Sequence, residues 1–214
     1  MASRLLIIRH ACVAPAFEER FVGKTNVSLN RRGERQAKAI ADLASTWNLS
    51  KCYVSPMARA LQTAGPIIEK LNISAQCEDD LREIDFGKWE GMTFCQVQRE
   101  HGHLVDQWCA SCGEFAFPSG ESMTDFHLRI ERCAEKLSTD PADTVLAVTH
   151  GGIIRALICR LLGLRPCDHV LFDVRPGSVT TIDFNDGKGL LVGLNDTCHL
   201  DGVEKLIPVG DARR

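Results

Sequence analysis

The feature that most constrains this sequence is a series of short apolar runs that alternate with longer helical patterns. The runs at 4–8, 51–54, 73–77 and 144–149 have the length of buried strands. Helical spacing marks 32–47, 94–108, 121–137 and 151–162, and another helix should start at Ser55-Pro56, where serine can cap it, and run to 71. A strand–turn–strand pattern fills 170–194. This order predicts an α/β three-layer sandwich, with a mostly parallel central sheet and helices on both faces.

Composition narrows the class of protein. The 214 residues are 44 % hydrophobic and 25 % charged, which is typical of a globular chain, and we expect one domain over 1–214. The net charge of −3 argues against a protein that binds nucleic acid or an anionic membrane. No apolar run approaches the roughly 18–20 residues of a membrane span, and no signal peptide is evident, so we expect a cytoplasmic protein. The ten scattered cysteines are expected to be reduced.

Charged and polar residues gather where the predicted strands end. Arg9 and His10 follow the first strand, and the sequence HGG at 150–152 follows the strand at 144–149. Arg59 lies about one turn into the helix after the strand at 51–54. Because ligands of open α/β sheets bind beyond the carboxyl ends of the strands, these groups should meet at one edge of the sheet.

This set of residues suits an anion, and phosphate in particular. Arginine offers a planar fork of donors that can bind two phosphate oxygens. Gly151 and Gly152 open a helix, whose free N–H groups favour an anion. A neutral imidazole can attack phosphorus, and a second, protonated imidazole can stabilise the phosphoryl oxygens. The sequence therefore predicts a positively charged phosphate site that includes His10 and His150.

Five segments resemble the histidine phosphatase superfamily, also called the phosphoglycerate-mutase-like family. They are LIIRH at 6–10, SPMARALQTA at 55–64, LREIDFGKWEG at 81–91, PSGES at 118–122 and VTHGG at 148–152. The matches follow the order of the family and extend over most of the chain. The segment at 118–122 resembles the compact phosphatase branch, which includes alpha-ribazole phosphatases.

The resemblance implies a role for each matching residue. His10 would be the nucleophile that accepts the phosphoryl group, and Glu83 would be the general acid that protonates the leaving oxygen. Asp85 and Glu90 lie in the same segment and remain alternatives to Glu83. No metal or other cofactor is implied. The groups expected to hold the phosphate are Arg9, Arg59, His150, Gly151 and the backbone N–H of Gly23.

The activity implied is metal-independent hydrolysis of a small phosphate ester through a phosphohistidine, with alpha-ribazole 5′-phosphate as one candidate substrate. Only 66 residues separate Glu83 from His150. The lid-like insertion around 92–120 is therefore short for a mutase, which must keep water from its phosphoenzyme. A phosphoglycerate mutase and a non-catalytic regulatory protein that binds a phosphate ligand remain alternatives. A homodimer is one oligomeric state that the sequence allows.

The sequence departs from the family motif directly after the first histidine. The family normally has glycine there, usually followed by an acid and a hydroxyl residue, whereas this chain has Ala-Cys-Val at 11–13. An asparagine that is frequent in the family is replaced by Ala16. These changes remove donors from one wall of the pocket, and Thr25, Asn26 or Ser28 could replace them.

A further group of potential metal ligands lies between residues 101 and 112. His101, His103, Cys109 and Cys112 could bind zinc, but the spacing of the two histidines is unusual and a second CxxC is missing. We therefore favour ordinary helix residues. Three nearby aromatic residues could form either an apolar wall for an aromatic leaving group or part of the core: Trp108, Phe115 and Phe117.

Overall fold

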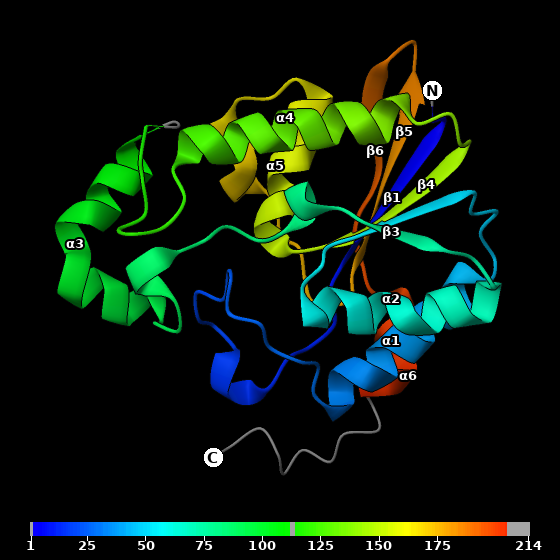
Figure 1. Ribbon diagram of the computed structural model, residues 1–214, viewed down its shortest axis with the longest axis horizontal. Coiled ribbons are helices and arrows are strands. Elements are labelled where there is room, and N and C mark those ends of the chain that lie inside the picture. Colours follow the sequence, from blue (N-terminus) through cyan, green and yellow to red (C-terminus); the bar gives the residue numbers. More distant parts are fainter. Residues whose placement is uncertain (1, 112–113, 205–214) are drawn as a thin grey trace.

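The computed structural model describes residues 2–111 and 114–204, and its centre is a six-stranded sheet (Figure 1). The strand order is β3-β2-β4-β1-β5-β6. Strands β1 to β4 are parallel, whereas β5 runs antiparallel to both β1 and β6. The predicted α/β class with a mostly parallel sheet is thus confirmed. The bounds are β1 Arg4–Arg9, β2 Lys51–Val54, β3 Ala75–Cys77, β4 Thr144–Thr149, β5 Val179–Asn185 and β6 Lys188–Asp196.

Helices cover both faces of the sheet (Figure 1). α1 (Arg31–Ala44) and α2 (Ala58–Leu71) lie on one face, and α4 (Met123–Thr139) and α5 (Gly151–Leu162) lie on the other. β1 shows why, because its apolar side chains alternate between the faces: Leu6 and Ile8 pack with α1 and α2, whereas Leu5 and Ile7 pack with α4 and α5. The short α6 (Asp201–Glu204) contacts α1. Among the described residues, no helix is long and apolar enough to cross a membrane.

Local sequence signals place most helix starts. Asn30 caps α1, Ser122 caps α4, and Thr93 forms a capping box with Gln96 at the start of α3 (Phe94–Ala110). The predicted cap at Ser55 is wrong, because α2 begins only at Ala58 and has no side-chain cap. The strand predicted from 170 is also wrong at its start: a 3-10 helix covers Pro166–Leu171, and β5 begins at 179.

The segment expected to form a lid-like insertion packs into the main core. Val97 and Val105 of α3 belong to the same hydrophobic cluster as Leu5 of β1. Fully buried Trp89 packs edge-on against Phe117, with ring centroids 5.3 Å apart. Val97 and Val105 therefore tie α3 to the core, although its ribbon extends away from the strands (Figure 1).

The cysteines mostly match the sequence expectation. Among the described residues eight are free, including the buried Cys12, Cys52, Cys133 and Cys159. Cys167 is disulfide-bonded, so the prediction that all ten are reduced is wrong there.

Candidate active site

The ends of β1 and β4 bring the two predicted histidines together. The parallel register pairs Arg9 with Thr149, so the residues that follow each strand are neighbours. The rings of His10 and His150 have centroids 5.2 Å apart and are inclined at 57°. Both side chains are buried. The geometric expectation that these imidazoles converge is therefore met.

His10 is held in one tautomer. Its Nδ1 lies 2.9 Å from the carbonyl oxygen of Ala11, and a carbonyl can only accept, so Nδ1 carries the proton. Nε2 then has a free lone pair, and it has no hydrogen-bond partner among the described residues. Burial lowers the pKa of His10 well below its ordinary value, and the charges of Arg9 and Arg59 lower it further. His10 is thus a neutral imidazole with an available nitrogen.

His150 is also neutral. Arg59 donates from Nε to Nδ1 of His150 at 3.1 Å, which leaves the ring proton on Nε2, where it is donated to the Ser55 hydroxyl at 2.8 Å. Burial is the main cause that lowers the pKa of His150 well below its ordinary value, followed by the charge of Arg59. The prediction of a protonated second imidazole is therefore wrong for this geometry. The hydroxyl of Ser55 contacts the histidine at 2.8 Å and accepts only a longer bond, at 3.4 Å, from the N–H of Met57 before α2.

Arg59 organises this buried group. Its side chain is only 1 % exposed. Besides His150, it donates to the carbonyl oxygens of Thr25 at 2.9 Å, Val22 at 3.1 Å and Gly23 at 2.9 Å. Arg59 therefore holds the loop at 22–25 as well as supplying positive charge. Because most of its donors are taken by protein atoms, its contribution to phosphate binding would be mainly electrostatic.

Arg9 has a spare donor at the same place. Nη1 donates to the carbonyl oxygen of Val174 at 2.6 Å, but the buried Nε has no partner. Burial lowers the pKa of Arg9. Gly151 lies against this guanidinium, and a Cβ there would be 3.4 Å from Cζ of Arg9. A buried N–H without an acceptor is costly, so Arg9 is well placed to bind an anion.

Glu83 faces the same site from a loop. Its Oε2 accepts from the N–H of Gly152 at 3.0 Å, and its Oε1 accepts from the N–H of Ile84 at 3.1 Å. A Cβ on Gly152 would lie 2.5 Å from Oε1, so any larger residue at 152 would displace the Glu83 carboxylate from this position. The N–H of Gly152, which was expected to be free for an anion, is therefore occupied by this carboxylate.

The alternative acids have structural contacts instead. Glu90 accepts from the backbone N–H groups of Gly23 and Lys24, both at 3.0 Å, and from Thr25. Asp85 accepts from Nζ of Lys24 at 2.9 Å. Of the three carboxylates, Glu83 lines the cavity and the other two do not. The prediction that the N–H of Gly23 faces phosphate is wrong in this structure, because that N–H is bound to Glu90.

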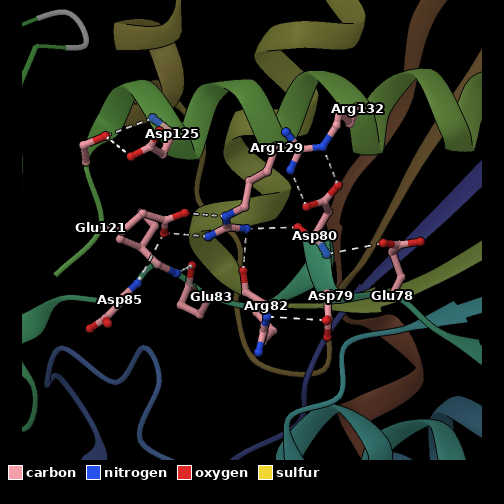
Figure 2. A network of polar contacts seen from close by, with 12 residues as sticks. Glu78, Asp79, Asp80, Arg82, Glu83, Asp85, Glu121, Asp125, Arg129 and Arg132 are labelled. Atoms are coloured by element: carbon pink, nitrogen blue, oxygen red, sulfur yellow. Dashed lines mark hydrogen bonds and ion pairs between the residues drawn. The ribbon is translucent and has the colours of Figure 1, made fainter.

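Figure 2 shows how the loop that carries Glu83 is held. Arg129 of α4 donates to both carboxylate oxygens of Glu121, at 2.6 and 2.8 Å, and to the carbonyl oxygens of Asp80 and Arg82. Arg132, one turn further along α4, pairs with the Asp80 carboxylate at 2.8 Å. The acid loop is thus fixed by side chains of a helix and not by strand pairing.

These groups share a cavity of about 720 Å³, lined by Arg9, His10, Arg59, Glu83 and Gly151 among others. Phe21, Phe86 and Trp108 form an apolar wall. Trp108 therefore matches the wall predicted from sequence, whereas Phe115 and Phe117 are buried in the core and do not line the cavity.

The predicted replacement donors do not reach the cavity. Thr25 bonds Glu90, Asn26 accepts from the N–H of Ala58, and Ser28 accepts from Gln62. Ala11 is buried, and its N–H donates to the Thr63 hydroxyl. Sequence reasoning missed other cavity residues, and no local motif singles them out: Cys12, His127, Arg155 and His169.

The zinc alternative gains no support from the described residues, in which no three potential metal ligands gather. His101 instead stacks on Trp89, with ring centroids 6.4 Å apart. Cys112 lies outside the described residues.

A neutral imidazole among arginines, beside a glycine-rich helix start and a carboxylate, defines an enzyme that handles phosphate groups. Residues 5–197 match the model of the histidine phosphatase superfamily, branch 1, and the chain belongs to this family. It is 30 % identical over 198 residues to phosphoserine phosphatase 1 of Hydrogenobacter thermophilus. The aligned residues cover 92 % of this chain and 94 % of that protein.

Two further comparisons agree. The chain is 28 % identical to the adenosylcobalamin/alpha-ribazole phosphatase of Escherichia coli, over 90 % of this chain and 95 % of that protein. The crystal structure of the alpha-ribazole phosphatase of Shigella flexneri superposes with a TM-score of 0.81 at 27 % identity, over 90 % of this chain and 96 % of that one. The predicted family is confirmed, and the chain is an enzyme of the phosphatase class.

Proposed function

We propose that this phosphatase hydrolyses a small phosphorylated metabolite through a phosphohistidine on His10, without a metal. The observation that carries the proposal is the tautomer of His10. The Ala11 carbonyl keeps the proton on Nδ1, which leaves Nε2 as a nucleophile in a cavity with Arg9 and Arg59.

The reaction follows from the placement of charge. Nε2 of His10 attacks phosphorus as the bond to the leaving oxygen breaks, and the guanidinium groups of Arg9 and Arg59 stabilise the charge on the other three oxygens. Protonated Glu83 gives its proton to the leaving oxygen. Ionised Glu83 then takes a proton from water as that water attacks the phosphohistidine. Inorganic phosphate is released, and His10 regains its lone pair.

The leaving group is less constrained than the phosphate. The wall formed by Phe21, Phe86 and Trp108 supports an aromatic leaving group, such as that of alpha-ribazole 5′-phosphate, on which the Escherichia coli relative acts by its name. The Hydrogenobacter relative is named for phosphoserine, whose leaving group is a small amino acid. A phosphoglycerate mutase on this site would require a bisphosphate for activity, and simple phosphate release would contradict it.

Trapping the intermediate tests the proposal. Rapid quench with ³²P-labelled substrate should place acid-labile, base-stable label on His10, and His10→Ala should abolish both labelling and turnover. Activity in the presence of EDTA should be unchanged. Full activity of His10→Ala would refute the mechanism.

Cys12 provides the matched control, because it is a second nucleophilic side chain in the same cavity. Burial raises the pKa of its thiol, so the reactive thiolate is disfavoured. Cys12→Ser should therefore retain the acid-labile label. Loss of label in Cys12→Ser, with retention in His10→Ala, would assign the intermediate to the cysteine.

A further inference from the structure

The peptide unit between Ala11 and Cys12 is bound on both of its polar sides. Its C=O accepts the Nδ1 proton of His10 at 2.9 Å, which is the contact that fixes the tautomer of His10. Its N–H donates to Oε1 of Gln36, also at 2.9 Å. Because this peptide bond is trans, the N–H and the C=O point in opposite directions. Gln36 therefore holds the peptide from the side opposite to His10.

Gln36 is a buried residue of α1, and only 1 % of it is exposed. The start of α1 lies directly against the backbone at Cys12. Asn30, which caps α1, donates its backbone N–H to the carbonyl oxygen of Cys12 at 3.1 Å. A Cβ on Gly33 would lie 2.1 Å from the same oxygen, so this close approach requires glycine. The approach of α1 brings the side chain of Gln36 to the N–H of Cys12, and burial keeps it there.

The two hydrogen bonds of this peptide reinforce each other. An N–H that is bound to an acceptor moves electron density toward the carbonyl oxygen of the same amide, which makes that oxygen a better acceptor. The stronger bond from Nδ1 of His10 fixes the ring and increases the electron density available at Nε2. Without the oxygen of Gln36, the buried N–H of Cys12 would lack an acceptor, and the peptide would be stabilised by turning toward another one. The carbonyl of Ala11 would then turn away from Nδ1.

The preceding peptide unit offers a comparison. The N–H of Ala11 donates to the Thr63 hydroxyl at 3.0 Å, and Thr63 is fully buried. This N–H belongs to the amide that contains the carbonyl of His10, which accepts from the N–H of Gly177 at 3.2 Å. It does not belong to the amide that binds Nδ1. Thr63 thus makes a buried contact of the same kind, one peptide away, without a direct effect on the imidazole of His10.

We propose that Gln36 is a positioning residue for the nucleophile. Acting through the peptide between Ala11 and Cys12, it keeps the proton of His10 on Nδ1 and directs the lone pair of Nε2 into the cavity that both residues line. Gln36 does this without touching the reacting atoms. The inference rests on the proposed phosphohistidine mechanism, and it identifies the side chain that sets the state of the nucleophile.

The tautomer of His10 can be measured directly in the resting enzyme. Nitrogen NMR of ¹⁵N-histidine-labelled protein at about pH 8, above the ordinary pKa of histidine, separates a protonated ring nitrogen from a bare one. His10→Asn assigns the signals. In the wild type, Nδ1 of His10 should be protonated and Nε2 bare. In Gln36→Met, which removes the oxygen at similar volume, the two signals should move toward each other as the second tautomer becomes populated.

Kinetics should show the same change as a loss of kcat. In Gln36→Met, kcat for p-nitrophenyl phosphate should fall about 10- to 100-fold, because the nucleophile is less well oriented. KM and inhibition by inorganic phosphate should change less than about threefold, because Arg9 and Arg59 remain. Gln36→Glu should restore the tautomer and part of kcat, since its carboxylate can accept from the same N–H. If Gln36→Met does not fold, Gln36→Asn, whose amide is too short to reach, should show the same mixed tautomer.

Thr63→Val is the matched control, because it removes a buried acceptor from the N–H of Ala11 instead. It should lower the midpoint of urea unfolding about as much as Gln36→Met, but leave the ¹⁵N signals of His10 in place. An unchanged tautomer in Gln36→Met, or an equal change in Thr63→Val, would overturn the inference and leave the phosphatase mechanism intact. If His10→Ala kept full activity, the mechanism would fail, and the NMR measurement on the resting enzyme would still decide whether Gln36 sets the tautomer.

Discussion

The two halves of the site are built in different ways. His10 and His150 directly follow buried parallel strands, so the ladder that joins β1 and β4 sets their separation. Glu83 lies on a loop without a regular strand, and Arg129 and other side chains of α4 hold that loop (Figure 2). Backbone pairing therefore positions the nucleophile, whereas ion pairs and hydrogen bonds position the acid. The halves should respond differently to substitution.

The largest effect is expected at Arg59, which contacts His150 and therefore belongs to the buried half of the site, the half with the two histidines. Arg59→Met leaves Nδ1 of His150 and the carbonyl oxygens of Val22, Gly23 and Thr25 without a donor. We expect kcat/KM for p-nitrophenyl phosphate to fall about 10³-fold. The free energy of unfolding in urea should fall by about 3 kcal/mol, because several buried acceptors lose their partner. A stable, active Arg59→Met variant would contradict this account of the buried half.

The next largest effect is expected at Glu83, where loss of catalysis can be distinguished from loss of stability. Glu83→Gln keeps an oxygen that can accept from Gly152 but removes the acidic proton. For an alkyl phosphate, kcat should fall about 10²- to 10³-fold. For p-nitrophenyl phosphate, whose leaving oxygen needs little protonation, the loss should be much smaller. The free energy of unfolding in urea should fall by no more than about 1 kcal/mol, because one of the two backbone N–H groups that bind Glu83 loses its acceptor.

Glu90→Gln is the comparison for that variant, because Glu90 binds the loop at 23–25 without lining the cavity. It should lower the free energy of unfolding and change kcat for the alkyl phosphate and for p-nitrophenyl phosphate by the same factor. If Glu83→Gln also lowered kcat for both substrates by the same factor, Glu83 would not be the proton donor.

Arg129 tests whether side chains position the acid loop. Its side chain is only 11 % exposed, and it bonds Glu121 and two loop carbonyls. Arg129→Gln should lower the free energy of unfolding by about 2–3 kcal/mol, because a nearly buried pair loses one partner. kcat for an alkyl phosphate should fall about tenfold, and inhibition by inorganic phosphate should persist. Unchanged kcat despite lower stability would show that the acid is positioned independently of Arg129.

The half of the site with the two histidines could be predicted from sequence more completely than the half with Glu83, and the reason is physical. Apolar runs identify buried strands, and parallel strands present their carboxyl ends at one edge, so the convergence of His10 and His150 follows from pattern alone. The hydrogen bond from His150 to Ser55 does not, because it depends on rotamers and on where α2 begins. The same holds for the N–H of Gly23, which is taken by Glu90.

A pH titration should detect the two buried imidazoles. The pKa values of His10 and His150 lie well below their ordinary value near 6.5, so below that pH the unfolded chain binds more protons than the folded one. The free energy of unfolding should therefore fall as pH decreases from about 6.5 to 5.5, by up to about 1.4 kcal/mol per histidine. His10→Asn should show a shallower slope in urea unfolding. A flat profile would mean that the imidazoles titrate in the fold as they do in the unfolded chain, and a rise in stability toward pH 5.5 would mean that they are protonated in the fold.

The smallest effect is expected at Arg132, and it sharpens the comparison within α4. Arg132 also reaches the acid loop, where it pairs with Asp80, but its side chain is 62 % exposed (Figure 2). Solvent screens such a pair, so Arg132→Gln should change the free energy of unfolding by less than about 1 kcal/mol. kcat for an alkyl phosphate should stay within about twofold of the wild type, because Arg129 still holds the loop carbonyls. If Arg132→Gln matched Arg129→Gln in both measurements, the acid would depend on the total positive charge of α4 rather than on the buried contacts of one arginine.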